Sequence, residues 1–236
     1  MPARLPSEAT HPNWTTIFEG PAVSGRVVKS QVVRLLHSGN ELYRELFCGV
    51  AGADWHAADD SIISDIKALE SLVGIRREIK SMISSGVVYG VNIGFMTAVC
   101  AGDLFLTHLS RIMKSGVIEI TEHGSENMSS ERIAALIGFC AKARQAGYRV
   151  VLDDVSPGYP LLGENFLLRV SPYAVKAVIG IKGLASIAAK AARMRMLLII
   201  ENIESRQDMV AAAASGANAL QGYWIERPKP AVAKLT

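Results

Sequence analysis

Acidic and amide side chains recur in this chain near the ends of short apolar runs. Asn92 ends the run VVYGVN, Glu119 lies in VIEITE, and Asp153 and Asp154 close YRVVLDD. Carboxylate and amide oxygens are the donors that hard divalent cations such as Mg²⁺ and Mn²⁺ prefer. An adjacent pair of aspartates could serve two ions about 3.5–4 Å apart, the arrangement that supports in-line displacement at phosphorus, so the residues favour phosphoester hydrolysis. Glu122 closes VIEITE, and comparable places in other runs are taken by Glu45, Lys176, Glu201, Glu204 and Gln221.

A compensating cation is needed if these side chains meet, because several carboxylates at one edge repel one another and raise one another's pKa values. Zinc is disfavoured as that cation, since the five histidines share no ligand spacing and no C-x-x-C pair is present. The cysteines, Cys48, Cys100 and Cys140, are odd in number and widely spaced. We therefore expect them to be reduced and buried, not joined in a disulfide framework.

The spacing of apolar residues indicates the elements that would hold these side chains. A turn at Gly39 and Asn40 between two β-type runs predicts a hairpin at the start of the folded body. Apolar residues at helical spacing then predict a helix over 61–85 that ends before Gly86. Ser205, with Asp208 three residues on, matches a capping box. Further helices, each followed by a short apolar strand, are predicted over about 97–115 (closed by Gly116), 129–145, 185–194 and 205–215.

This alternation predicts a mostly parallel sheet covered by helices. Seven or eight strands in 236 residues favour a closed (β/α) barrel, although periodicity alone leaves an open doubly wound sheet as an alternative. The absence of G-x-G-x-x-G after a strand and of G-x-x-x-x-G-K-[ST] weakens that alternative. In a barrel the carboxyl ends of the strands share one rim, so the polar residues would line one anionic mouth. Each polar residue alone could merely cap a turn, but that role does not explain their recurrence at successive strand ends.

Composition and charge exclude several classes of protein. Half of the residues are apolar, so the chain can bury a sizeable core and is not a disordered protein. The net charge of +3 is spread without a basic block, which indicates neither a nucleic-acid nor a membrane-surface partner. No apolar run approaches the roughly 18 residues of a membrane span, and no secretory signal is apparent, so we expect a cytoplasmic protein. Four prolines near the start predict an N-terminal arm over 1–25, followed by one domain over 26–236.

Six motifs occur in order along the chain: QVVRLLHSGNELYRELF, VNIG, EITE, DDVSPGY, IENIES and GANALQGYWIERPKP. From about residue 31 to residue 230 they are similar to motifs of one family. The first resembles an opening hairpin that leads into a Glu-Ala-Leu triplet, and the next two resemble Val-Asn-Leu-Ser and Glu-Leu-Thr-Glu. The last three resemble Asp-Asp-Phe-Gly-Thr-Gly-Tyr, Ala-Glu-Gly-Val-Glu-Thr, and a Gln-Gly-Tyr segment with Pro-x-Pro. The chain thus resembles the EAL-domain family of bacterial cyclic-di-GMP phosphodiesterases.

The resemblance implies a fold and an activity. The fold would be a TIM-like (β/α)8 barrel of the EAL type that opens with a β-hairpin. The activity would be hydrolysis of one phosphodiester bond of cyclic di-GMP to linear pGpG, as part of bacterial second-messenger signalling, with two Mg²⁺ or Mn²⁺ ions as cofactors. The partners that the resemblance suggests are cyclic di-GMP, a second copy of the chain in a homodimer, and a regulatory protein.

The resemblance also assigns roles to individual residues. Lys176 would contact the attacking water and the phosphate, and Gln31 would face the substrate. Glu122 would anchor the loop that follows Asp154, which in this family contributes to the dimer interface. The catalytic residues would be Lys176, Glu204 and Glu45, and the metal ligands would be Glu45, Asn92, Glu119, Asp153, Asp154, Glu204 and Gln221.

Three positions depart from the family pattern. Gly49 replaces the arginine that would clamp a substrate phosphate. Pro157 fixes a φ angle in a loop where the family has Phe-Gly-Thr, and Val32 replaces a proline. Two interpretations therefore stay open: an active phosphodiesterase with weakened substrate binding, and a catalytically weak or inactive EAL module that binds cyclic di-GMP or a protein. A third interpretation, an unrelated Mg²⁺-dependent barrel enzyme with another substrate, also stays open.

Overall fold

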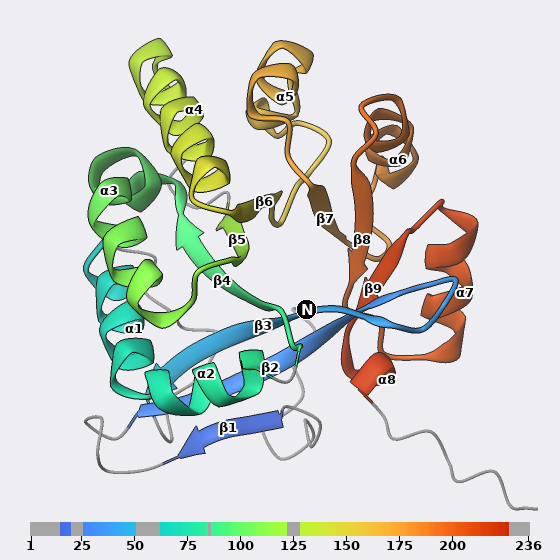
Figure 1. The fold of residues 1–236 in the computed structure, drawn as a ribbon. Helices are drawn as coiled ribbons and strands as arrows, with labels where there is room; N and C mark the ends of the chain where they lie inside the picture. The colour runs from blue at the N-terminus through green and yellow to red at the C-terminus, as the bar shows by residue number, and fades with distance from the viewer. Residues whose placement is uncertain (1–14, 20–25, 51–61, 85, 122–127, 227–236) are drawn as a thin grey trace, which may run out of the picture.

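A closed ring of eight strands, β2 to β9, forms the centre of the protein (Figure 1). The computed structural model describes residues 15–19, 26–50, 62–84, 86–121 and 128–226. The strands β2 (Arg26–Leu35) and β3 (Glu41–Val50) form the predicted antiparallel hairpin. Strand β9 pairs with β2 and closes the ring, which confirms the predicted barrel that opens with a hairpin. The strands between them run parallel in chain order: β4 (Tyr89–Gly94), β5 (Gly116–Thr121), β6 (Tyr148–Leu152), β7 (Ala174–Val178), β8 (Leu197–Glu201) and β9 (Ala219–Gln221).

A further strand, β1 (Thr15–Glu19), extends the sheet outside the ring. It pairs with the Val27–Ser30 part of β2, on the edge that β9 uses from Val33 onward. This strand lies within the predicted N-terminal arm, where the sequence pattern indicated no regular structure. The boundary of the folded domain at residue 25 stays a prediction.

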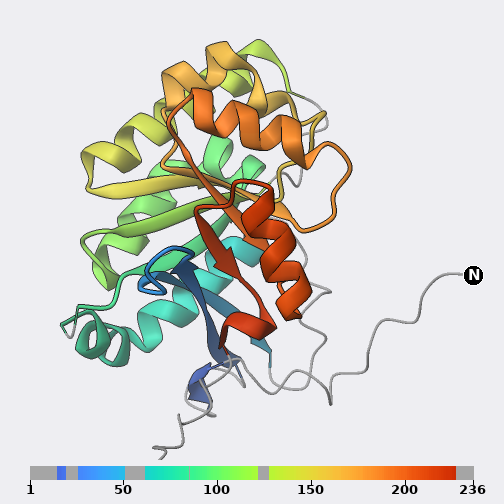
Figure 2. The same ribbon diagram turned by 90° about the vertical axis from the view of Figure 1, so that its right-hand side faces the viewer.

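Helices surround the ring and cover the outer face of its strands (Figures 1 and 2). The predicted single helix over 61–85 is in fact two helices that meet at Gly74 and Ile75. The predicted end at Gly116 was also wrong, because α3 stops at Ile112 and Gly116 begins β5. No described helix is both long and apolar enough to cross a membrane. The helices are α1 (Ile62–Gly74), α2 (Arg76–Ser84), α3 (Phe95–Ile112), α4 (Ser130–Gln145), α5 (Glu164–Val170), α6 (Leu184–Arg193), α7 (Arg206–Ala214) and α8 (Tyr223–Glu226).

Side-chain capping explains where two of the helices begin. Ser129 accepts a hydrogen bond from the Arg132 N–H at the start of α4. The predicted capping box of Ser205 and Asp208 is present at the start of α7, with both hydrogen bonds formed. These two helix starts are therefore confirmed.

The three cysteines are free, as expected, but only Cys140 is buried; Cys48 is partly buried and Cys100 is exposed.

The interior of the ring contains a layer of buried side chains that point inward from successive strands. Tyr43 is the largest of them, and Gly90 on the neighbouring strand leaves room for it, because a Cβ atom at Gly90 would lie 3.0 Å from the Tyr43 ring. Side chains alternate between the two faces of a strand, so the residues two positions nearer the rim point into the same interior. The apolar layer therefore determines which residues point inward at the rim of the barrel. The layer consists of Val33, Tyr43, Val117, Val151, Ala174, Ile199 and Ala219.

The end of β9 lies in close contact with the chain that follows β8. Gly222 has a φ of +145°, and a Cβ atom there would lie 2.3 Å from the backbone nitrogen of Ile203. The Ile203 N–H donates to the Gln221 carbonyl oxygen at 3.1 Å, and the Trp224 N–H donates to the Ile203 carbonyl oxygen at 2.8 Å. A glycine is therefore required after Gln221, on both steric and conformational grounds.

We expect Gly222→Ala to lower the free energy of unfolding by about 2 kcal/mol or more, because the added Cβ must displace backbone atoms. Gly138→Ala is the matched control. Gly138 lies exposed in α4 with open space around its Cβ position, so alanine should raise the free energy of unfolding by about 0.5–1 kcal/mol. Urea denaturation measures both changes, and equal stability of the two variants would contradict this account.

Candidate metal centre

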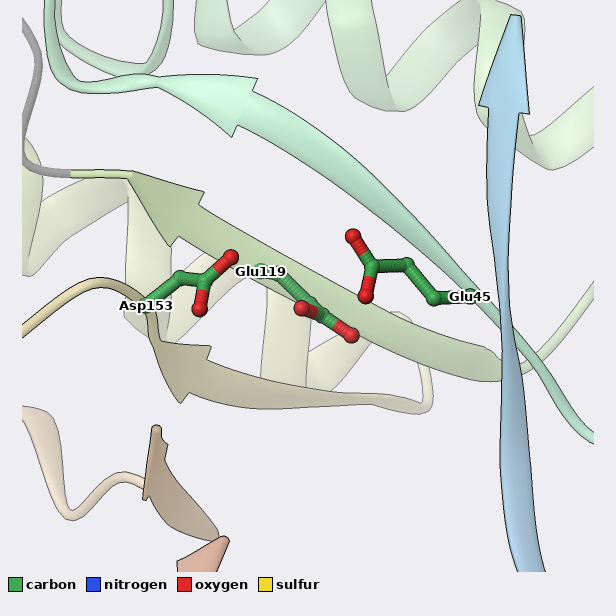
Figure 3. A group of neighbouring side chains, drawn as sticks. All are labelled: Glu45, Glu119 and Asp153. Carbon is green, nitrogen blue, oxygen red and sulfur yellow. The ribbon is translucent and has the colours of Figure 1, made fainter. Parts of the chain in front are cut away.

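Four carboxylates converge on one buried ammonium group at the rim of the barrel. The Lys176 side chain is 1% exposed, and its Nζ lies 3.0 Å from Glu45 Oε2 and 2.5 Å from Glu119 Oε2. The same Nζ lies 3.1 Å from Asp153 Oδ1 and 3.0 Å from Glu201 Oε1. Figure 3 shows the carboxyl groups of Glu45, Glu119 and Asp153 close together in the interior of the ring. Sequence positions up to 156 residues apart, from β3 to β8, thus meet around one charge.

Each of these residues lies two positions beyond a residue of the apolar layer. Glu45 follows Tyr43 on β3, and Lys176 follows Ala174 on β7. Because β2 runs in the opposite direction, its rim residue precedes the apolar one, so Gln31 lies two positions before Val33. Strand alternation and the shared register therefore assemble the site. The other rim residues follow the same rule: Glu119, Asp153, Glu201 and Gln221.

Amide groups hold Glu45 from both sides. Asn92 Nδ2 donates to Glu45 Oε1 at 2.6 Å, and Gln221 Nε2 donates to Glu45 Oε2 at 2.6 Å. The Gln221 amide also donates to Gln31 Oε1 at 3.0 Å. Both oxygens of Glu45 thus accept a hydrogen bond from an amide, which fixes the orientation of its carboxylate.

The charges of the cluster do not balance. Burial raises the pKa of Glu119 well above its usual value, and the nearby carboxylate of Glu45 raises it further. Burial raises the pKa of Glu201 in the same way, with Asp153 as the next cause. Burial alone would lower the pKa of Lys176, but the four carboxylates outweigh it and hold that pKa well above its usual value. The lysine therefore stays protonated, and one positive charge faces four acidic groups.

The donor atoms that remain fit a hard divalent cation. Glu45, Glu119 and Asp153 offer oxygens within 4.8 Å of one another, and so do Asp153, Asp154 and Glu201. Among the described residues, Asn92 Oδ1 and Glu119 Oε1 are buried oxygens that have no hydrogen-bond partner. Such orphaned acceptors next to excess negative charge are what an oxygen-preferring ion would satisfy. Because Asp153 belongs to both groups, the set has a shared ligand for two neighbouring ions.

Asp154 is held in an unusual backbone conformation. Its φ is +51°, in the left-handed region, and its N–H donates to the Oδ1 atom of Asp153 at 2.9 Å. A non-glycine residue in this region carries a conformational cost and is found mainly where the surrounding structure requires it. The conformation turns the chain away from the strand direction directly after Asp153.

Glu204 is the sequence-predicted ligand and catalytic residue that the structure does not bring to this cluster. Strand β8 ends at Glu201, and Asn202, with a φ of +57°, turns the chain toward α7. Glu204 is therefore exposed, and its N–H donates to Asp208 at 3.1 Å beside the capping box. Glu201 lies in the cluster instead, and its position two residues after buried Ile199 was the sequence signal for it. Glu122 lies outside the described residues.

Two other features were not predicted as parts of the site. The buried hydroxyl of Tyr43 lies beneath the carboxylates, and burial raises its pKa, with Glu119 as the next cause, so the phenol stays neutral. In the loop after Asp154, the Val155 N–H donates to the Lys176 carbonyl oxygen at 3.0 Å. Pro157, farther along this loop, packs against Gly183 before α6, where a Cβ atom would lie 2.6 Å from Pro157 Cγ.

Comparison with known proteins identifies the fold. No family model matches the chain. The PaMucR phosphodiesterase, solved with c-di-GMP, has a TM-score of 0.70 and 19% identity over 88% of this chain and 93% of that one. An EAL-domain protein from Listeria monocytogenes EGD-e has a TM-score of 0.69 and 14% identity over 89% of this chain and 91% of that one. The chain has the fold of an EAL domain. The expected resemblance to the EAL-domain family is confirmed.

Two further proteins are similar to this chain. The YkuI protein of Bacillus subtilis, with an EAL domain, was solved with substrate c-di-GMP and calcium; its TM-score is 0.68 and its identity 19%, over 88% of this chain and 55% of that one. A relative from Escherichia coli (strain K12) is a probable cyclic di-GMP phosphodiesterase, PdeN. It is 28% identical over 167 residues, which make up 65% of this chain and 31% of PdeN. The matched part of the chain thus corresponds to about a third of that relative.

We expect Mg²⁺ or Mn²⁺ to raise the melting temperature of this protein by roughly 5–10 °C at about one hundred times Kd. Glu119→Gln should shrink that rise, because it removes one negative charge from the cluster. The melting temperature without metal should be equal or higher in this variant, since a buried carboxylate beside Glu45 is neutralised and the amide oxygen can still accept from Lys176. Thermal unfolding with and without metal measures both effects. Glu164→Gln, at an exposed ion pair with Arg193, is the control; an unchanged rise in Glu119→Gln would contradict the assignment.

Proposed function

We propose that this chain is a divalent-metal-dependent phosphodiesterase that hydrolyses one phosphodiester bond of cyclic di-GMP and releases linear pGpG. The observation that carries the proposal is the buried cluster of four carboxylates around Lys176, with unpaired oxygens at its edge. PdeN is a probable cyclic di-GMP phosphodiesterase, PaMucR is a phosphodiesterase, and c-di-GMP is bound to PaMucR and YkuI; these similarities support the choice of substrate.

The proposed roles follow from the geometry of the site. Divalent ions would supply an activated water and would neutralise charge on the phosphoryl oxygens. Water adds to phosphorus, the bond from phosphorus to a ribose oxygen breaks, and that oxygen leaves with a proton. Lys176 would donate to a phosphate oxygen or to the attacking water, and its charge would stabilise the transition state. Glu201 would hold the Lys176 ammonium in place. The residues that would hold the ions are Glu45, Asn92, Glu119, Asp153, Asp154 and Gln221.

A cyclic-di-GMP receptor without turnover is the second candidate, and one observation favours it. Gly49 lies on β3 opposite Val27 and offers no side chain to a substrate phosphate. Loss of a charge-assisted clamp weakens substrate binding, although it leaves the metal ligands intact. A homodimer formed through the loop after Asp154 and a regulatory protein partner stay predictions.

One assay separates the two candidates. The purified chain is incubated with cyclic di-GMP and Mg²⁺ or Mn²⁺, and pGpG is measured by chromatography. Binding of cyclic di-GMP is titrated in parallel in Ca²⁺, the ion found with this ligand in YkuI. Appearance of pGpG supports the phosphodiesterase. Binding without product would overturn it in favour of a receptor, and neither binding nor product would overturn both.

We expect Glu45→Ala to reduce hydrolysis of cyclic di-GMP by about 10²-fold or more, a loss comparable to removal of one key electrostatic group from an active site. The fold should be retained, because the change removes a charge from a like-charged cluster and leaves the apolar layer intact. Glu41→Ala, on the same strand, where Glu41 pairs with Arg44, is the matched control and should keep its activity. Unchanged turnover in Glu45→Ala would refute the role of Glu45.

We expect Gly49→Arg to lower the KM for cyclic di-GMP about tenfold, which corresponds to about 1.4 kcal/mol, because it supplies a charge-assisted contact to a phosphate. Gly49→Met adds a side chain of similar reach without charge and serves as the control. Steady-state kinetics measures both variants. If arginine lowered KM no more than methionine, the missing clamp would not be what limits substrate binding.

A further inference from the structure

Among the residues that the structure describes, no strand pairs with one edge of β2 at Gln31 and Val32. Strand β1 pairs with this edge as far as Ser30, and β9 joins it at Val33. Between them, the N–H of the fully buried Val32 donates to Oε1 of Glu226 at 2.5 Å. A carboxylate from the end of α8, 194 positions away in the sequence, thus satisfies a backbone donor that none of the described strands reaches.

The one-turn helix α8 delivers this carboxylate because it follows β9 directly. The Trp224 N–H donates to the Ile203 carbonyl oxygen at 2.8 Å, and the Ile225 N–H donates to the Gly222 carbonyl oxygen at 3.0 Å. These bonds tie α8 to the ends of β8 and β9, and α8 contacts β2. Glu226 therefore links β2 and β9 at the point where the barrel closes.

The neighbours of this link are residues of the metal centre. Gln31, which directly precedes Val32, lies opposite Glu45 in the register of β2 and β3. The Gln221 amide donates to both of these side chains, at 3.0 Å to Gln31 Oε1 and at 2.6 Å to Glu45 Oε2. A change in the distance between β2 and β9 would therefore change the hydrogen bonds that orient Glu45.

We propose that Glu226 is a positioning residue for the metal centre, which acts by holding the Val32 N–H so that Gln221 reaches both Gln31 and Glu45. This inference deepens the proposed function and rests on it. Glu226 touches neither the ions nor the substrate in this role; it acts through β2. The strand pairing between β2 and β9 covers only three residue pairs, so one additional link carries a substantial share of that junction.

The role requires a hydrogen-bond acceptor and not a charge. Burial raises the pKa of the Glu226 carboxyl, while the Val32 N–H and then Arg44 act in the opposite direction. The amide oxygen of glutamine can accept the same hydrogen bond. Glu226→Gln should therefore preserve the site, whereas Glu226→Ala leaves the buried Val32 N–H without its partner.

The test compares these variants by Mn²⁺ affinity, by kcat for cyclic di-GMP, and by amide hydrogen exchange at Val32. Glu226→Ala should lower kcat about tenfold and Mn²⁺ affinity about fivefold, with faster exchange at Val32, and Glu226→Gln should stay within about twofold of the wild type in all three. Asp103→Ala, which removes an exposed carboxylate paired with Lys142, is the control for loss of a charge. All measurements are made at a temperature at which unfolding curves show each variant to be folded.

A double-mutant cycle separates positioning from general destabilisation. Val32→Pro removes the donor, and proline is tolerable in a strand where its N–H is not used by a neighbouring strand. In that background, Glu226→Ala should have no further effect on Mn²⁺ affinity or kcat. The proposal is overturned if Glu226→Ala behaves like the wild type, if Glu226→Gln is as impaired as alanine, or if the two losses simply add. If the wild type turned over no cyclic di-GMP, the proposed function would fail, while Mn²⁺ affinity would still decide the role of Glu226.

Discussion

The burial of the Lys176 ammonium among four carboxylates is the interaction on which the rest of the structure depends. A lysine in an apolar interior would lose its proton, and isolated carboxylates there would gain one. In this barrel each sign of charge stabilises the other, but the acidic groups remain in excess. The site is therefore built to hold more positive charge than the chain itself supplies, which is the physical basis for assigning it to divalent cations.

The barrel meets this requirement through its register. The charged layer lies directly above the apolar layer. Because every second residue of a strand points inward, the residue two positions from a member of the apolar layer must lie in the charged layer. A slip of one residue in any of these strands would replace its inward-pointing polar residue with an outward-facing one. Gly90, which makes room for Tyr43, and Gly222, which permits close approach to Ile203, show how small residues allow the two layers to form. The ladder between β2 and β9 has only three residue pairs, and the Glu226 side chain supplements it.

Much of this arrangement could be predicted from local patterns. Short apolar strands that end in acidic residues indicated the barrel and its polar rim, and Ser205 with Asp208 marked the start of α7. The choice between Glu201 and Glu204 depended on where β8 ends, which is set by the left-handed turn at Asn202 and not by hydrophobicity. The break at Gly74 and the short helix α5 were missed because tertiary packing, more than periodicity, decides such elements. The link from Glu226 to Val32 joins the two ends of the domain, and no local signal predicts it.

The most direct test of the account is the location of Mn²⁺ by anomalous diffraction in crystals of the protein grown with this ion. We expect Mn²⁺ coordinated by Glu45, Glu119 and Asp153, and a second Mn²⁺ bound by Asp153 and Asp154. An absence of anomalous density at these side chains, at an Mn²⁺ concentration that saturates binding in solution, would contradict it.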